Sequence, residues 1–195
     1  MLAACVALGA TACGRHVYLG KLADSGAPAD SGAPPDTGAP PDGGAQILWR
    51  ATFEPGDLSE WVGDGNGGVY MDARATAPAA SADVAHQGRY SGIAAFAPMG
   101  VTSWSYLYRD QPSPPEAYYG AWFYIPAGLQ IRSWLSLHHF GYHRSAGAEI
   151  TPLWDFNVYP GPDGKLIARL YESAAVANFD QANPIPVPVG QWVHF

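Results

Sequence analysis

Short runs in which apolar and polar residues alternate fill the second half of the chain and limit what it can fold into. Residues 153–159 alternate in this way and stop at the turn-forming residues 160–164, after which residues 165–171 alternate again. A period of two is typical of a β-strand with one buried face, and Asp163-Gly164 is typical of a tight hairpin turn. No stretch of eleven or more residues has the apolar spacing of a helix. The sequence therefore predicts an all-β domain.

Further strands are predicted from β-branched and aromatic runs bounded by Gly and Pro, at residues 47–53, 90–96, 103–109, 118–125 and 134–140. Many short strands separated by such turns indicate an antiparallel two-sheet β-sandwich or a barrel. The chain stops at Phe195 inside an apolar strand, without a turn or a polar tail. An unpaired strand at this place would leave the core unfinished, so we expect the domain to be C-terminally truncated.

A six-residue repeat of Asp, Ser or Thr, Gly, Ala and Pro runs through residues 24–45. It contains no aromatic and no large aliphatic residue, so burial cannot offset the entropy lost on ordering it. Proline and the repelling aspartates favour an extended spacer. We therefore predict a disordered linker over 14–46 and a folded domain over 47–195.

The first thirteen residues are apolar or small and carry no charge. They are too few to span a bilayer, and they are typical of the apolar part of an export signal. We expect 1–13 to be an N-terminally truncated signal or lipoprotein leader, with Cys13 as the lipidated residue and Cys5 as the alternative. An ordinary signal peptide with incidental cysteines is the other interpretation. Either one predicts an extracytoplasmic protein, anchored by a lipid or secreted.

The charge and residue composition limit the classes of ligand that the protein can bind. The chain has a formal net charge of −7, which argues against a nucleic-acid partner because phosphates require clustered Lys and Arg. Its two cysteines both lie in the leader, so the domain has no disulfide framework. The basic residues of the domain are mostly Arg and the region is rich in Trp and Tyr, a surface suited to stacking and forked hydrogen bonds.

Four motifs follow one another along the predicted domain, at residues 53–61, 86–91, 118–126 and 187–192. The first resembles the opening strand and the second the next strand of the jelly rolls in the concanavalin A-like lectin and glucanase superfamily, and the other two follow in the same order. The layout is similar to heparin lyase or alginate lyase-like domains and to LamG-type binding domains. The resemblance implies a jelly roll in which one sheet presents its outward residues to a polysaccharide.

Lyases of this group resemble one another in using a neutraliser and a His or Tyr as base and acid. Proton abstraction beside a uronate carboxylate requires that carboxylate's charge to be damped and a base placed at the sugar carbon. The resemblance then implies Arg109 or Asn157 as neutraliser, His138 or His139 as base and Tyr142 as acid. Relatives usually carry a Gln near His138, and this chain has none there.

The histidines allow other interpretations. His138 and His139 are neighbours on a predicted strand, so they face opposite surfaces and only one can reach a cleft. A structural pair, with one histidine in the core and one on a surface, is the plainest interpretation. Zinc bound by His138, His139 and His143 is a further alternative, for which no recognised ligand spacing is present.

A structural calcium ion near the first strand is the cofactor that the resemblance implies. Its oxygen ligands would come from Glu54, Asp57 and Asp64. The alternative is that Gly56-Asp57 only forms a turn and that Glu54 is solvated.

Aromatic side chains are the candidates for contact with sugar, because a flat ring can cover the C–H face of a pyranose. Half of each alternating strand must instead fill the core. The candidates are Tyr106, Tyr108, Tyr118, Trp122, Tyr124 and Trp154. We expect a non-catalytic polysaccharide-binding domain, with a polysaccharide lyase that acts by β-elimination and a purely structural surface domain as alternatives.

Overall fold

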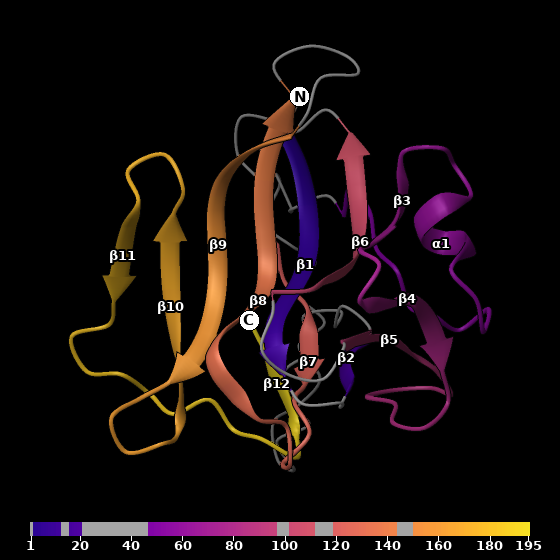
Figure 1. Cartoon of the computed structure of the whole chain (residues 1–195). Coiled ribbons are helices and arrows are strands. Elements are labelled where there is room, and N and C mark those ends of the chain that lie inside the picture. Colours follow the sequence, from indigo (N-terminus) through magenta and orange to yellow (C-terminus); the bar gives the residue numbers. More distant parts are fainter. Residues whose placement is uncertain (1, 13–15, 21–46, 97–101, 112–118, 144–149) are drawn as a thin grey trace, which may run out of the picture.

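The computed structural model describes residues 2–12, 16–20, 47–96, 102–111, 119–143 and 150–195 of the chain (Figure 1). Nearly all of its regular structure is β-strand, arranged in two antiparallel sheets, which confirms the predicted all-β class. The one helix of the described part is α1 (Ser59–Val62).

Sheet A has seven strands in the described part of the chain. Their spatial order is β11 (Ala177–Asp180), β10 (Leu166–Glu172), β9 (Ile150–Pro160), β8 (Ile131–His143), β1 (Leu2–Ala12), β6 (Trp104–Gln111) and β3 (Gly67–Met71).

Sheet B is smaller. Its described strands are, in spatial order, β12 (Trp192–His194), β7 (Trp122–Tyr124), β2 (His16–Gly20), β5 (Ser91–Phe96) and β4 (Ala75–Ser81). In Figure 1 the long strands β1, β8 and β9 stand side by side, as their hydrogen-bonded pairing requires.

The predicted hairpin is present as β9 and β10. Its turn places Gly164 at a φ of 77°, a conformation that glycine adopts without strain. The Gly161 amide donates to the Lys165 carbonyl at 2.7 Å, which closes the turn. This turn fixes the register across the two strands, so that Asn157 lies opposite Arg169.

The hydrophobic core draws side chains from both sheets. Leu135 of β8, Val158 of β9 and Ala168 of β10 lie on one face of sheet A and are buried, and Phe123 of β7 is buried with them. Because strand side chains alternate, the residues between these positions point to the opposite face. We call that opposite face the outer face of sheet A.

Residues 47–53, which the alternation predicts as a strand, form no strand in the structure. The Glu60 carboxylate of α1 instead accepts hydrogen bonds from the backbone amides of Thr52 and Phe53, at 2.7 and 2.6 Å. A side chain has therefore taken the donors that a strand neighbour would have used. Phe53 has a φ of 62°, which ends any extended run at this point.

The division of the chain also differs from the expected one. Residues 2–12 pair with β6 on one side and β8 on the other, and residues 16–20 pair with β5 and β7. The sheets thus take strands from the segments assigned to the leader and the linker as well as from 47–195. Cleavage of the leader stays a prediction.

Candidate functional site

Two rows of polar side chains cross the outer face of sheet A. Residues that lie directly opposite each other in antiparallel strands share a face, so the register defines each row. One row runs through His139, Asp155, Tyr171 and Asn178, and the other through Ser136, Asn157, Arg169 and Asp180. The first row continues toward β6, because the β1 backbone places Cys5 opposite both His139 and Tyr108.

A groove of about 410 Å³ lies on this face, over strands β8 to β11. Its walls combine three aromatic rings with short polar side chains, one carboxylate and one guanidinium. The lining residues are Ser133, Trp134, Asp155, Asn157, Tyr159, Arg169, Tyr171 and Asn178. A groove that mixes flat rings with a few convergent polar groups is the usual form of a small-molecule or saccharide site.

His139 and Asp155 form a hydrogen-bonded pair in the first row. The Asp155 Oδ1 oxygen contacts Nδ1 of His139 and also accepts a hydrogen bond from the Ser136 hydroxyl at 3.3 Å. Both side chains of the pair are 14% exposed, so they are held rather than freely solvated. In the tautomer that donates Nδ1–H to the carboxylate, the imidazole has its lone pair on Nε2.

A β-bulge positions His139. The register between β8 and β9 shifts between Ser136 and His138, so Leu137 is an extra residue on the β8 side. A bulge of this kind re-aims the side chains that follow it. His138 consequently points into the core and His139 lies on the outer face.

Arg169 is fixed at the far side of the groove. Its Nε and Nη2 groups donate to the two oxygens of Asp180, at 2.6 and 3.1 Å. Its guanidinium carbon lies 3.8 Å from the centroid of the Tyr159 ring, and the Tyr159 hydroxyl donates to Asp180 at 2.6 Å. These hydrogen bonds hold the pKa of Asp180 below its usual value, and the one from Arg169 contributes most.

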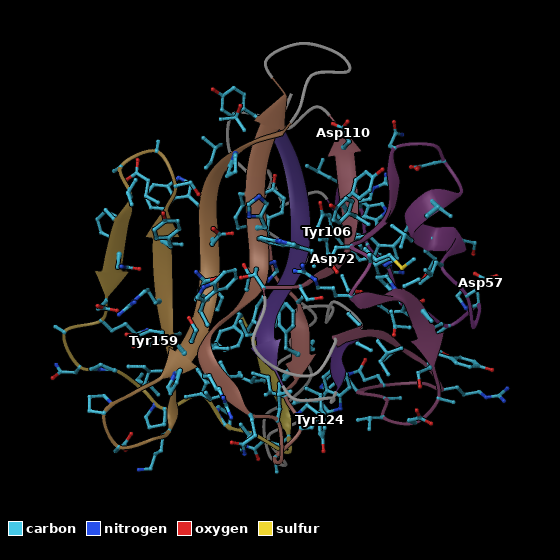
Figure 2. The ribbon with its side chains drawn as sticks, in the orientation of Figure 1. Asp57, Asp72, Tyr106, Asp110, Tyr124 and Tyr159 are labelled. Carbon is cyan, nitrogen blue, oxygen red and sulfur yellow. The ribbon has the colours of Figure 1, made fainter. Side chains whose placement is uncertain are left out.

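An aromatic strip continues the outer face from β8 toward β3. Trp134 of β8 lies 6.0 Å from Trp104 of β6, measured between ring centroids. Tyr106 follows on β6 and stacks on Tyr70 of β3 at 4.9 Å. In Figure 2, Tyr106 lies by β6 and Tyr159 by β9 and β10, while Tyr124 lies by β7 of the other sheet.

His138, a candidate base, is a core residue. It is 9% exposed and packs against the rings of Phe123, Phe140 and Phe156, at centroid distances of 5.0, 5.9 and 6.4 Å. Its Nε2 nitrogen has no hydrogen-bond partner among the described residues. Burial lowers the pKa of His138 to about 4, and His194 acts in the same direction. Tyr142, the candidate acid, shares the face of Phe140 through the alternation of β8 and so points away from His139.

Arg109, a candidate neutraliser, lies on the core side of β6 and is 4% exposed. Its two terminal nitrogens bind the carboxylate of Asp64 at 2.7 and 2.6 Å, and one of them also donates to the Trp61 carbonyl. Its guanidinium carbon lies 4.9 Å from the Trp49 ring. Arg109 therefore anchors the segment around α1 and does not reach the groove. Asn157, the other candidate neutraliser, does line it.

The six aromatic candidates separate in the structure. Tyr106 and Tyr108 lie on the outer face of sheet A with Trp104, as the alternation of β6 requires. Trp122 and Tyr124 belong to sheet B and pack against His86 and Trp192 there. Trp154 lies on the opposite face of β9 from Asp155 and contacts Phe179, and Tyr118 lies outside the described residues.

The three candidate calcium ligands each have a separate partner. Glu54 accepts hydrogen bonds from the backbone amides of Arg89 and Tyr90, Asp57 accepts one from the Ser59 amide, and Asp64 binds Arg109. Across the described side chains, no group of three or more His, Cys, Asp or Glu residues is placed to hold a metal ion. Calcium and zinc both stay predictions, and the side chain of His143 is outside the described part.

The two cysteines differ in placement. Cys5 lies in β1, and Cys13 lies outside the described residues, so lipidation stays a prediction. Among the described helices, none is long and apolar enough to cross a membrane.

Apart from Asn157, the residues that line the groove were not among the sequence candidates, and neither was Ser136. Two of them could have been found from the predicted hairpin, because its turn places Arg169 opposite Asn157 and Tyr171 opposite Asp155. A polar residue at every second position of β9 was the signal. Ser136 needs knowledge of the bulge, which the sequence does not display.

Comparison with family models, with curated proteins and with solved structures finds no match to this chain.

Proposed function

We propose that this is an extracytoplasmic polysaccharide-binding protein that holds its ligand on the outer face of sheet A. The observation that carries the proposal is the groove lined by Trp134, Tyr159 and Tyr171 together with the amides of Asn157 and Asn178. Aromatic rings provide flat apolar area for the C–H faces of sugars, and the amides and carboxylate between them take hydroxyl groups. The aromatic strip of β6 and β3 extends this surface beyond the groove, as a polymeric ligand would require.

The fold that we propose for the whole domain is a concanavalin A-like jelly roll. Two antiparallel sheets that share one core are compatible with it. In such a fold the ligand lies across one sheet, on the face opposite the core, which is where the groove is found.

Affinity gel electrophoresis of the full chain tests the binding function. Migration is compared in gels that contain different dissolved polysaccharides and in a gel that contains none. Trp134→Ala removes a groove wall and should abolish most of the retardation, because stacked aromatic residues dominate such interfaces. Trp122→Ala is the matched control, since it removes the same side chain from sheet B. Equal loss of retardation in both variants would contradict a site on the outer face.

A polysaccharide lyase is the second candidate function, and the His139–Asp155 pair favours it. Nε2 of His139 could accept the proton beside a uronate carboxylate, with Asp155 holding the ring through Nδ1. Asn157 could donate to the uronate carboxylate as neutraliser. Tyr171 lies opposite Asp155 and could serve as the acid, a role for which Tyr142 faces the wrong side.

The lyase is tested by incubation with alginate, glucuronan and heparin, followed by the ultraviolet absorbance of the unsaturated product. Activity that is lost in His139→Ala and kept in His138→Leu would establish it. Retardation in polysaccharide gels without any unsaturated product would exclude the lyase and leave the binding function.

We propose Cys13 as the site of a lipid anchor. Metabolic labelling with a fatty acid in a bacterial host tests this assignment, with Cys13→Ser and Cys5→Ser compared in the same experiment. Loss of label only in Cys13→Ser is expected. Loss only in Cys5→Ser would move the anchor to the alternative residue, and an unlabelled parent protein would exclude both.

A further inference from the structure

Negative charge exceeds positive charge in and around the groove. The lining contains one cation, Arg169, and one carboxylate, Asp155, while a second carboxylate, Asp180, is bound to that cation. Two carboxylates thus stand against one guanidinium on this part of the outer face. Lys165, on the neighbouring turn, is paired with Asp163 at 3.3 Å and does not line the groove.

Two of the three guanidinium nitrogens of Arg169 are already occupied. Asp180 takes its Nε and Nη2 groups in a two-point pair, and its flat face lies on the Tyr159 ring. An incoming carboxylate or sulfate would have to displace Asp180 or approach it closely. Like charges placed together in a partly desolvated site cost free energy, which discriminates against the wrong ligand.

The remaining polar groups suit hydroxyls. Asn157 is 8% exposed and lines the groove, and its Oδ1 oxygen has no hydrogen-bond partner among the described residues. An amide offers both a donor and an acceptor, and a hydroxyl group is its natural complement because it also offers both. Asn178, also in the lining, is an exposed amide of the same kind.

From these observations we infer that the groove selects uncharged polysaccharides over acidic ones, and that Asp180 is the residue that sets this selectivity. The inference rests on the proposed binding function and narrows its ligand class. Asp180 acts by holding Arg169 and by adding its own negative charge, without itself lining the groove.

Affinity gel electrophoresis with two panels of polysaccharides tests the inference. The uncharged panel contains xyloglucan, mixed-linkage β-glucan and galactomannan, and the acidic panel contains alginate, polygalacturonate and heparin. Physiological ionic strength limits the repulsion between the net negative chain and acidic gels to about 8 Å. We expect retardation by at least one uncharged polysaccharide and none by the acidic panel.

The variant Asp180→Asn releases Arg169 and should raise the affinity for acidic polysaccharides by roughly fivefold, the usual scale for one partly exposed charge, so that retardation appears in acidic gels. Asp163→Asn is the matched control, because it removes the same charge and frees Lys165 away from the groove. Circular dichroism tests whether each variant is folded. Equal behaviour of the two variants would overturn the role of Asp180.

The selectivity and the binding function are tested separately. Retardation by the acidic panel that equals or exceeds that by the uncharged panel would overturn the selectivity and leave the binding function. Absence of retardation in both panels would overturn the proposed binding function, and the selectivity with it. The comparison between panels uses the unaltered protein, so it decides the selectivity of the groove even if Asp180→Asn fails to fold.

Discussion

Replacement of His138 by leucine should stabilise the protein, and more so in acid. His138 is 9% exposed, lies among three phenylalanine rings and leaves Nε2 without a hydrogen-bond partner in the described structure. A buried polar atom without a partner costs about 1–3 kcal/mol, and leucine of similar size removes that cost. At neutral pH we therefore expect His138→Leu to raise the free energy of unfolding slightly, after some loss from imperfect packing.

The pH dependence follows from the pKa of His138. Burial lowers this pKa from 6.5 to about 4 in the folded protein. Between these values the unfolded chain binds a proton that the folded protein refuses, so stability is highest above pH 6.5 and falls as the pH drops toward 4. With 1.36 kcal/mol for each pKa unit, the loss between neutral pH and pH 5 is about 2 kcal/mol. His138→Leu should be free of that loss.

Urea denaturation followed by tryptophan fluorescence, at neutral pH and at pH about 5, measures the effect. The difference in free energy of unfolding between His138→Leu and the parent protein should grow by about 2 kcal/mol on acidification. His139→Leu is the control, since it removes the partner of Asp155 on the other face and should destabilise at neutral pH. A difference that does not change with pH would refute the placement of a neutral His138 in the core.

Other predictions concern the loops that support the sheets. Gly88→Ala should destabilise by about 1–2 kcal/mol or more, since Gly88 has a φ of 73° and an added Cβ would lie 2.1 Å from the Glu54 carboxylate. Gly164→Ala has a similar φ of 77° but open space around it, so thermal unfolding should show the smaller loss there. Asp64→Asn should lower the urea midpoint because it leaves the buried Arg109 without its carboxylate, and this loss should shrink when Arg109→Met is also present.

The strands that could be predicted from the sequence are those marked by local alternation of apolar and polar residues. The β9–β10 hairpin follows from alternation on both sides of Asp163-Gly164, and the structure confirms it together with its turn. Strands β5, β6 and β8 were predicted near their observed places for the same reason. Residues 47–53 have the same pattern and form no strand, because the Glu60 carboxylate accepts the hydrogen bonds of the Thr52 and Phe53 amides.

The site was predictable only where register could be read from a turn. His139 and Asn157 were candidates and lie on the outer face, but the sequence could not say which of His138 and His139 faces outward. That choice depends on the bulge at Leu137, which a strand pattern does not reveal. The structure places Arg109 away from the groove, beside Asp64, and a partner 45 residues away in the sequence cannot be read from a local pattern.

The central claim is that the outer face of sheet A holds the polysaccharide. Hydroxyl-radical footprinting of the full chain, with and without a polysaccharide that retards it in gels, tests this claim residue by residue. We expect the polysaccharide to protect Trp134, Tyr159 and Tyr171 from oxidation and to leave the oxidation of Trp122 and Trp192 on sheet B unchanged. Protection of Trp122 and Trp192, with no change at the groove residues, would contradict this claim.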